Sequence, residues 1–157
     1  MDIVVRPAKT EDATHACNVL RRSIVECCQE DHQGESEALD AWLHNKTTGD
    51  VRSWIQSPDL FSWAAVVEAK IVGFSMSSRS GNVLLCYLVP EVRHMGVGKA
   101  MLKAIGEQAK ADGINALHLE STKTARSFYL RNGFVECGAP IAAFGMKSYP
   151  MKKTLVE

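Results

Sequence analysis

The chain has 157 residues, of which 46% are hydrophobic and 23% are charged, and its formal net charge is zero. This length is typical of one domain with a substantial core, predicted to span residues 1–157. The balanced charge gives no reason to expect nucleic acid or an anionic membrane as a partner. No run of about 18 apolar residues predicts a membrane span, and the first residues do not have the pattern of a signal peptide.

The cysteines predict neither a disulfide framework nor a metal site. Five are present, at positions 17, 27, 28, 86 and 137, and none forms a Cys-x-x-Cys pair. Such a set fits reduced thiols, so we expect a cytoplasmic location. Cys28 and His32 are four residues apart and can share a helix face. A zinc site needs three or four ligands, so no metal is predicted.

Hydrophobic periodicity predicts alternating strands and helices along the chain. Thr10 can cap a first helix, and the stripe Ala13, Ala16, Cys17, Leu20 and Ile24 would be its buried face. In order, the first half should contain a strand at 2–6, this helix, helical regions around 39–43 and 51–55, and strands at 61–68, 71–78 and 83–89. A tight turn at Ala69-Lys70 should join the first two of these three strands.

In the second half of the chain, the pattern predicts fewer helices and strands. A helix should follow the loop at residues 93–98, bury Met101, Leu102, Ile105 and Ala109, and stop at Gly113. A strand at 116–120, a short helix at 125–131 and a last strand near 149–155 should follow. Residues 137–148 show no regular pattern. No repeat or linker interrupts the chain, so we expect one mixed α/β domain with a mostly antiparallel central sheet and helices on both faces.

The loop at Arg93–Gly98 is the most informative segment. It reads Arg-His-Met-Gly-Val-Gly, follows a strand that stops at Pro90, and runs directly into a helix. Such a turn presents unpaired backbone N–H groups at the positive end of a helix dipole, where phosphate groups bind. The pattern therefore predicts a phosphate or pyrophosphate site.

Two common phosphate loops do not fit this segment. A Walker loop requires Ser or Thr after Gly-Lys, but Ala100 follows Gly98-Lys99. A dinucleotide-binding loop requires a third Gly or Ala at the position that Met101 occupies. The remaining pattern is Arg-x-x-Gly-x-Gly between a strand and a helix.

A second motif lies at residues 121–134, which read Ser-Thr-Lys-Thr-Ala-Arg-Ser-Phe-Tyr-Leu-Arg-Asn-Gly-Phe. Thr124 can act as a helix N-cap, and Asn132-Gly133 can end the helix with a left-handed turn. Phe128 and Tyr129 therefore sit on a short helix after a strand. Core packing is the alternative role for both rings, although a buried tyrosine hydroxyl needs a polar partner.

Together the two motifs resemble the GNAT superfamily of N-acetyltransferases over nearly the whole chain. The first is similar to the acetyl-coenzyme A pyrophosphate loop of that family, and the second to its Ala-x-x-Phe-Tyr-x-x-x-Gly-Phe segment. The resemblance implies the GNAT fold, an α/β sheet of six or seven strands flanked by about four helices. It also implies direct transfer of an acetyl group from acetyl-coenzyme A to a primary amine of a small molecule or peptide.

The resemblance further implies roles for individual residues. A backbone N–H at a bulge of the fourth strand, matched by Leu88, would polarise the thioester carbonyl, and Tyr129 would be the general acid. Glu120 is a candidate base, and Asp31, His32 and Tyr87 are candidates for the acceptor site. The implied cofactor contacts are Leu88, Val89, Arg93, His94, Met95, Gly96, Val97, Gly98, Lys99, Ala100, Thr124, Ala125 and Phe128. Arg93 has a structural brace as its alternative role.

The acceptor is less defined by the sequence. Residues 26–40 carry six acidic residues and no Lys or Arg, which would favour a cationic amine if this segment rims the pocket, or would form a solvated surface. Trp42, Trp54 and Trp63 have pocket lining or core packing as alternatives. The resemblance also implies a possible homodimer, with residues 137–148 as its interface region. A non-catalytic acyl-coenzyme A sensor and an interaction module remain as alternative functions.

Overall fold

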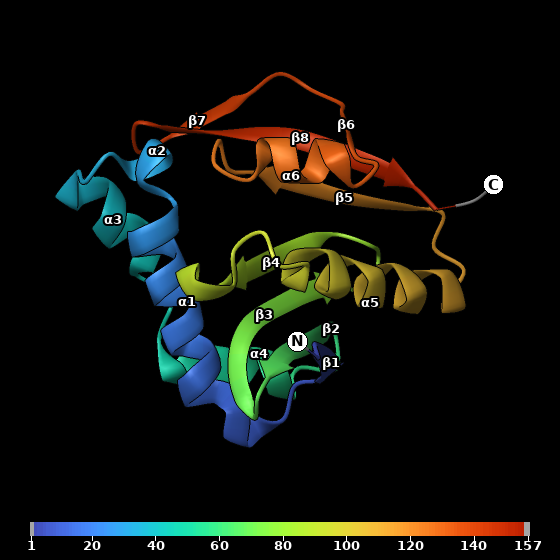
Figure 1. Cartoon of the computed structure of the whole chain (residues 1–157). Helices are drawn as coiled ribbons and strands as arrows, with labels where there is room; N and C mark the ends of the chain where they lie inside the picture. Colours follow the sequence, from blue (N-terminus) through green and yellow to red (C-terminus); the bar gives the residue numbers. More distant parts are fainter. Residues whose placement is uncertain (1, 156–157) are drawn as a thin grey trace.

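The computed structural model describes residues 2–155 and contains two antiparallel sheets with helices packed around them (Figure 1). The first sheet has the order β1-β2-β3-β4, from Val4–Pro7, Leu60–Val67, Lys70–Ser78 and Val83–Leu88. The second has the order β5-β8-β6, from Ala116–Ser121, Met146–Thr154 and Val135–Glu136, with β7, Ile141–Ala143, also paired to β8. The predicted α/β GNAT fold class is confirmed.

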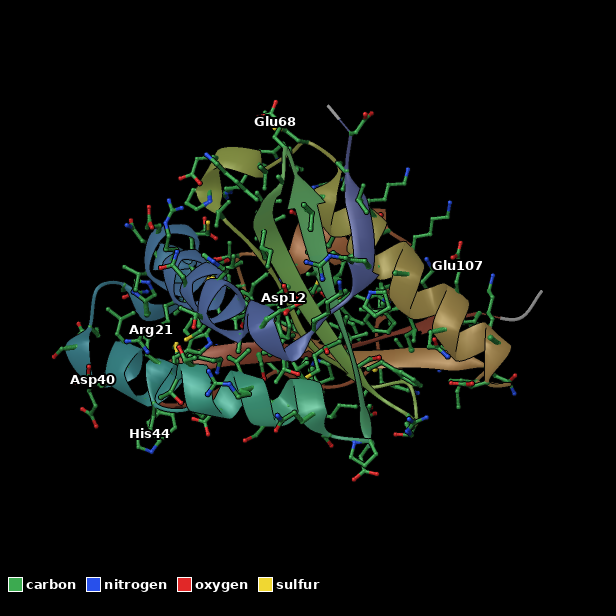
Figure 2. The ribbon with its side chains drawn as sticks, turned by 90° about the horizontal axis from the view of Figure 1, so that it is seen from below. Asp12, Arg21, Asp40, His44, Glu68 and Glu107 are labelled. Carbon is green, nitrogen blue, oxygen red and sulfur yellow. The ribbon has the colours of Figure 1, made fainter. Side chains whose placement is uncertain are left out.

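The helices of the first half extend from one face of the first sheet to the second sheet. After a 3-10 turn at Thr10–Asp12, they are α1, Ala13–Cys27; α2, Gln29–His32; α3, Ser36–Leu43; and α4, Thr48–Gln56. The predicted stripe of α1 is buried and packs with Val51 of α4 against Phe74 and Met76 of β3. Arg21 of α1 donates to the carbonyls of Leu43 and Lys46, at 3.2 and 2.9 Å, and so ties α1 to the end of α3 (Figure 2).

Helix α5, Val97–Ala111, packs on the other face of the first sheet and leads into the second sheet. It buries Met101, Leu102, Ile105 and Ala109, as the sequence predicts, and ends before Gly113. The short helix α6, Arg126–Arg131, packs on the second sheet. Within residues 2–155, no helix combines the length and apolar character that a bilayer crossing requires.

The two sheets separate between β4 and β5. In the described part of the chain, the only pairing across this boundary is the parallel bridge between Asn82 and His118. Beyond that bridge, β4 keeps its pairing with β3 but has no ladder with β5. The predicted single central sheet is therefore divided, and this division positions the functional site.

Two local predictions were wrong because their turns lack the usual residues. The β2–β3 turn lies at Glu68-Ala69, one residue earlier than predicted, with φ values of 51° and 65°. Residues 137–148 are not irregular throughout, because β7 and β8 form a hairpin around Phe144-Gly145, with φ values of 53° and 74°. Tight hairpin turns with positive φ usually contain Asn-Gly or Asp-Gly, and neither turn does.

Candidate functional site

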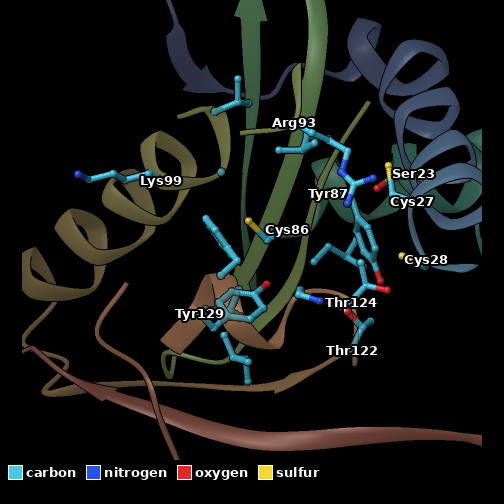
Figure 3. A pocket seen from close by; sticks show the side chains of 18 of the residues that line it. Ser23, Cys27, Cys28, Cys86, Tyr87, Arg93, Lys99, Thr122, Thr124 and Tyr129 are labelled. Carbon is cyan, nitrogen blue, oxygen red and sulfur yellow. Dashed lines mark hydrogen bonds between the residues drawn. The ribbon is translucent and has the colours of Figure 1, made fainter. Parts of the chain in front are cut away.

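A cavity of about 310 Å³ opens where β4 and β5 separate (Figure 3). Its wall combines β4, the end of β5, the loop before α5, the start of α6 and the last turn of α1. The two sequence motifs, about 30 residues apart, therefore meet at one cavity. Residues from both line it, including Arg93, His94, Gly96, Val97, Gly98 and Lys99 from the first motif and Thr122, Thr124, Ala125, Phe128 and Tyr129 from the second.

The loop before α5 holds several backbone N–H groups free. His94 and Gly96 adopt positive φ values of 63° and 89°, which turns the chain sharply into the helix. Among the backbone hydrogen bonds of residues 2–155, none uses the N–H of His94 or Gly96, or of Val97–Lys99 in the first turn. These N–H groups lie at the start of a 15-residue helix and carry its partial positive charge. The first turn of that helix contains no acidic residue.

Three of the predicted cofactor contacts have N–H groups that are already hydrogen-bonded within the protein. The N–H of Met95 donates to the carbonyl of Val92 at 3.3 Å, and that of Ala100 donates to Gly96 at 3.0 Å. Val89 is buried in the core beneath the loop, and its N–H donates to Val72. None of the three lines the cavity, and their contacts with the cofactor stay a prediction. The spacing of the sequence motif identified the loop, but it did not indicate which N–H groups of the loop are free of backbone hydrogen bonds.

The side chains of the loop diverge. Figure 3 shows Lys99 pointing away from the cavity and Arg93 extending toward Ser23 and Cys27 of α1. Arg93 has no carboxylate within salt-bridge distance among the described residues. Its guanidinium charge favours the thiolate of Cys27 and opposes the effect of burial, which raises the pKa of that thiol.

Gly98 and Phe128 join the two motifs by direct contact. A Cβ atom on Gly98 would lie 2.8 Å from the Phe128 ring, closer than such atoms approach in real structures. The phenyl ring therefore occupies the space that any other side chain at position 98 would need. Close approach to this ring, and not backbone conformation, therefore favours glycine at position 98, where φ is ordinary.

The N–H of Leu88 is free for a reason that the sequence did not suggest. The irregularity in the β3–β4 pairing lies near Leu84, where Met76 pairs with Leu85 but Ser77 pairs with Val83, so the bulge predicted at Leu88 is wrong. Val89 donates to Val72 of β3 at 2.9 Å. Because consecutive N–H groups of a strand point to opposite sides, the Leu88 N–H points toward β5, across the boundary where the ladder is missing.

Tyr129 is buried, with 7% of its surface exposed, and its hydroxyl points into the cavity toward β4 (Figure 3). Its ring packs edge-on against Phe128 and Phe134, with centroid distances of 5.2 and 5.4 Å. Burial, together with the neighbouring Cys86 thiol, raises the pKa of Tyr129 well above its usual value of 10. The phenol is therefore protonated throughout the neutral range and can donate a proton.

The start of α6 differs from the prediction. The helix begins at Arg126, and its N-cap is Ala125, not Thr124. The Thr122 hydroxyl accepts from the Ala125 N–H at 3.0 Å, and the Thr124 hydroxyl instead donates to Asp31 at 2.5 Å. The C-terminal prediction is confirmed, because Gly133 has a φ of 91° and Phe134 N–H donates to Tyr129 at 3.1 Å.

A second, more open cavity of about 490 Å³ adjoins the first. Tyr87, Glu120 and Thr122 line both, so the two cavities meet at these residues. Glu120, the residue before the last of β5, has an exposed carboxylate that accepts from the Ser148 hydroxyl at 3.0 Å. Burial raises the pKa of Tyr87 above its usual range, so its phenol is protonated and is not a base at neutral pH.

Asp31 and His32 lie in α2 and are both buried. The carboxylate of Asp31 accepts three hydrogen bonds from Lys123 and Thr124. The Gly34 N–H donates to Nδ1 of His32 at 2.9 Å, and Nε2 lies 3.0 Å from the carbonyl of Ile24. His32 lines neither cavity and both of its ring nitrogens bind backbone, so its contact with the acceptor stays a prediction.

The remaining acidic residues of the first connection are solvated. Of the six at positions 26–40, only Asp31 lines a cavity. Trp42 lines the second cavity, whereas Trp54 and Trp63 belong to the core. Of the expected acidic rim, only Asp31 therefore faces a cavity.

Sequence reasoning missed the thiols and hydroxyls of the cavity wall. Ser23, Cys27 and Cys28 come from the last turn of α1, and Cys86 from β4. Burial raises the pKa of Cys86, and that of Cys28, to about 12, so both thiols are protonated. Strand alternation was a usable signal for Cys86, because it shares a side of β4 with Leu88. The end of α1 gave no comparable signal.

This chain is similar to known proteins in sequence pattern and in fold. The family model of the acetyltransferase (GNAT) domain matches residues 28–155. A GCN5-related N-acetyltransferase from Rhodopseudomonas palustris has 20% sequence identity and a TM-score of 0.86, with 98% of this chain and 96% of that one covered. A comparison with curated proteins gives no significant sequence match.

Two further structures of the same fold are complexes with coenzyme A. The PaiA N-acetyltransferase of Thermoplasma acidophilum has 23% identity and a TM-score of 0.81, with 98% of this chain and 99% of that chain covered. An aminoglycoside 6'-N-acetyltransferase has 12% identity and a TM-score of 0.72, with 98% of each chain covered. At these identities the likeness is one of fold.

Proposed function

Because the chain belongs to the GNAT acetyltransferase family, we propose that it moves an acetyl group from acetyl-coenzyme A to a primary amine of a small molecule or peptide. The observation that carries the proposal is the cavity between β4 and β5. It brings together the free amides at the start of α5, the strand that holds the unpaired N–H of Leu88, and the hydroxyl of Tyr129. Each of these groups matches one requirement of acetyl transfer.

The cavity fits the donor at both ends. The amides of His94, Gly96 and Val97–Lys99 suit a pyrophosphate, because they are free and lie at a helix start. Thr124, Ala125 and Phe128 line the opposite wall, and Arg93 supplies a cation at the loop. The thioester end would lie between β4 and β5, beside Leu88. No described residues form a metal cluster, and the proposed roles use only protein groups.

The proposed chemistry assigns one task to each group. The N–H of Leu88 donates to the carbonyl oxygen as negative charge develops there, an effect worth about 2.7–4 kcal/mol where such donors have been removed. The amine nitrogen bonds to the carbonyl carbon, and the carbon–sulfur bond breaks. Glu120 takes the proton from the amine, directly or through water, and Tyr129 protonates the departing sulfur.

The second cavity is the proposed acceptor site, since it meets the first at Tyr87, Glu120 and Thr122. An amine that enters through it would reach the point where Glu120 and the thioester are both close. The names of the coenzyme A complexes, an aminoglycoside 6'-N-acetyltransferase among them, are consistent with an amine acceptor. We keep a homodimer as a possible assembly and propose neither a nucleic acid nor a membrane partner.

The test is acetyl transfer to a panel of amines that includes polyamines, aminoglycosides and amino-terminal peptides. The product should be detected by mass spectrometry, because the exposed Cys137 would react with a thiol reagent used to follow coenzyme A. We expect acetylated product from at least one amine class. Binding of acetyl-coenzyme A without transfer to any amine would favour the sensor, and absence of binding at millimolar concentration would favour the interaction module.

A further inference from the structure

The carboxylate of Asp31 accepts three hydrogen bonds close to the two cavities. Only 8% of the residue is exposed. Its Oδ1 atom accepts from the Lys123 N–H at 2.7 Å, and its Oδ2 atom accepts from the N–H and the hydroxyl of Thr124 at 3.2 and 2.5 Å. These donors lie 92 and 93 residues away in sequence. Both oxygens of Asp31 are therefore used to hold one distant segment.

Two N–H groups of that segment have no acceptor within the segment. Residues 122–125 connect β5 to α6, and their N–H groups precede a helix that has no side-chain cap. The Thr122 hydroxyl accepts from Ala125, which leaves the N–H groups of Lys123 and Thr124 without a local acceptor. Lys123 is exposed and Thr124 is half-buried, and a carboxylate gives their N–H groups shorter and stronger hydrogen bonds than a neutral oxygen does. Asp31 supplies this carboxylate.

The segment also sets the position of the proposed acid. Helix α6 has six residues, and Tyr129 is the fourth. A helix this short has little stability of its own, so its placement depends on its contacts at either end. Thr124 and Ala125 line the cofactor cavity, and Phe128 and Tyr129 follow within one turn. Any shift of residues 122–125 would therefore move the phenol relative to β4.

Helix α2, which carries Asp31, is itself held in place by hydrogen bonds. Helix α2 lies at the end of α1, at the level of the second sheet (Figure 1). The buried His32 ring binds the backbone at Ile24 and Gly34, which holds α2 against α1. Asp31 lines the second cavity and its partner Thr124 lines the first. The hydrogen bonds thus cross between the acceptor side and the cofactor side.

We propose that Asp31 is a positioning residue that fixes residues 122–125 and thereby aligns Tyr129 and the cofactor wall. The inference rests on the proposed function for its kinetic consequence, but its structural part does not. In this role Asp31 does not act as a base, and its carboxylate accepts hydrogen bonds from the N–H groups of residues 123 and 124. The acceptor-side helix α2 and the second cofactor motif then behave as one unit.

The test compares Asp31→Asn with Thr124→Val and with the control Glu30→Gln, an exposed neighbour in the same helix. Asn is nearly isosteric, but it replaces one acceptor oxygen by a donor, so either the Lys123 N–H or the Thr124 N–H loses its partner. We expect amide hydrogen exchange at one of these two residues, measured by NMR, to become at least tenfold faster. We expect kcat to fall at least tenfold while the protein still unfolds cooperatively. Thr124→Val, which keeps both amide bonds, should have a smaller effect, and Glu30→Gln none.

Two results would overturn the proposal. One is unchanged exchange at both Lys123 and Thr124 in Asp31→Asn. The other is faster exchange with a wild-type kcat, which would reduce the contact to a structural one. If Asp31→Asn does not fold, Thr124→Val decides, and a wild-type kcat in that variant rejects the role. If the wild type acetylates no amine, the proposed function fails separately. Asp31 is then tested by calorimetry, where an unchanged coenzyme A affinity in Asp31→Asn rejects the role and a fivefold loss supports it.

Discussion

Tyr129 combines burial with a hydroxyl that points into the cavity, and these two properties make a specific kinetic prediction. We expect Tyr129→Phe to lower kcat about 100-fold, the lower range for loss of a general acid, and to leave coenzyme A affinity within about twofold. Tyr149→Phe, at a tyrosine that lines neither cavity, is the matched control. Steady-state kinetics in saturating substrate provide the measurement, and an unchanged kcat in Tyr129→Phe would reject the assignment.

The raised pKa of Tyr129 also determines the expected pH dependence. A proposed acid must be protonated to act, and burial keeps this phenol protonated beyond its usual value of about 10. The kcat profile should therefore show no decline from this group between neutral pH and about 10. A falling limb below that pH which disappears in Tyr129→Phe would contradict the effect of burial.

Gly98 makes the second prediction at this scale. A methyl group at position 98 would meet the Phe128 ring at 2.8 Å, so Gly98→Ala must displace the ring or the loop. We expect coenzyme A affinity to fall about tenfold, which corresponds to about 1.4 kcal/mol. Isothermal titration calorimetry would measure this loss.

Gly106→Ala is the control for that variant, because it lies in the same helix and its Cβ would approach no atom closer than 3.9 Å. Alanine is the better helix former by about 0.5–1 kcal/mol, so this control should be slightly more stable and bind coenzyme A normally. Equal affinities of the two variants would show that the contact with Phe128 is not required for binding.

Residues also differ in how far the sequence predicted their roles. Gly96, Gly98, Phe128 and Tyr129 were identified because local motifs place them near a helix start. The burial of His32 was not foreseen, because its partners are backbone carbonyl and amide groups that sequence does not specify. Asp31 was assigned to the acceptor, although its partners lie more than 90 residues away.

At the scale of elements, Asp12 joins β1 to the start of α1. Its carboxylate accepts from Arg6 at 2.8 and 3.1 Å and from the Lys9 N–H at 2.7 Å. The hydrogen bonds from Arg6 hold the pKa of Asp12 below its usual value. We expect Asp12→Asn to lower the free energy of unfolding at pH 7 by about 2 kcal/mol, typical of a hydrogen bond to a charged group. Urea unfolding would measure the change.

The sign of the pH effect follows from the lowered pKa. The contribution of ionised Asp12 is complete above its unfolded-state pKa of about 3.9 and is lost as the pH falls through the lower folded-state value. The stabilities of wild type and Asp12→Asn should therefore converge below about pH 3.9. Glu11→Gln, at the exposed neighbour, should differ little from wild type at any pH. A stability difference for Asp12→Asn that persists undiminished at lower pH would contradict this account.

Elements with strong local signals were predicted well. Helices α1 and α5 have continuous apolar stripes, and β4 ends two residues before Pro90, so their patterns were sufficient. The β7–β8 hairpin was missed because all three residues of β7 are exposed and its turn contains Phe144-Gly145. Helix α2, with four residues, is too short for periodicity to reveal.

For the whole molecule, the divided sheet predicts a large effect of the donor on stability. A ligand that fits between β4 and β5 contacts both sheets and binds the folded state alone. At 100 times its dissociation constant, it should add about 2.7 kcal/mol. For a chain of this length that corresponds to a rise in Tm of about 5–10 °C.

A thermal-shift titration with coenzyme A measures this rise. Gly98→Ala should give a smaller shift at the same concentration, since its cradle is disturbed. A wild-type Tm that does not move at millimolar coenzyme A would contradict the assignment of this cavity to the donor.

The division between β4 and β5 has a further consequence, for folding. Residues 4–88 supply every strand of the first sheet, and residues 116–154 supply every strand of the second. Each sheet closes its own loops, so the entropy lost on closure is modest, and either half can begin to organise before the other. The shared core, in which Trp63 and Val83 meet Leu117 and Phe134, forms when the halves dock. The cavity would then take its final shape in this docking step, after the secondary structure that lines it.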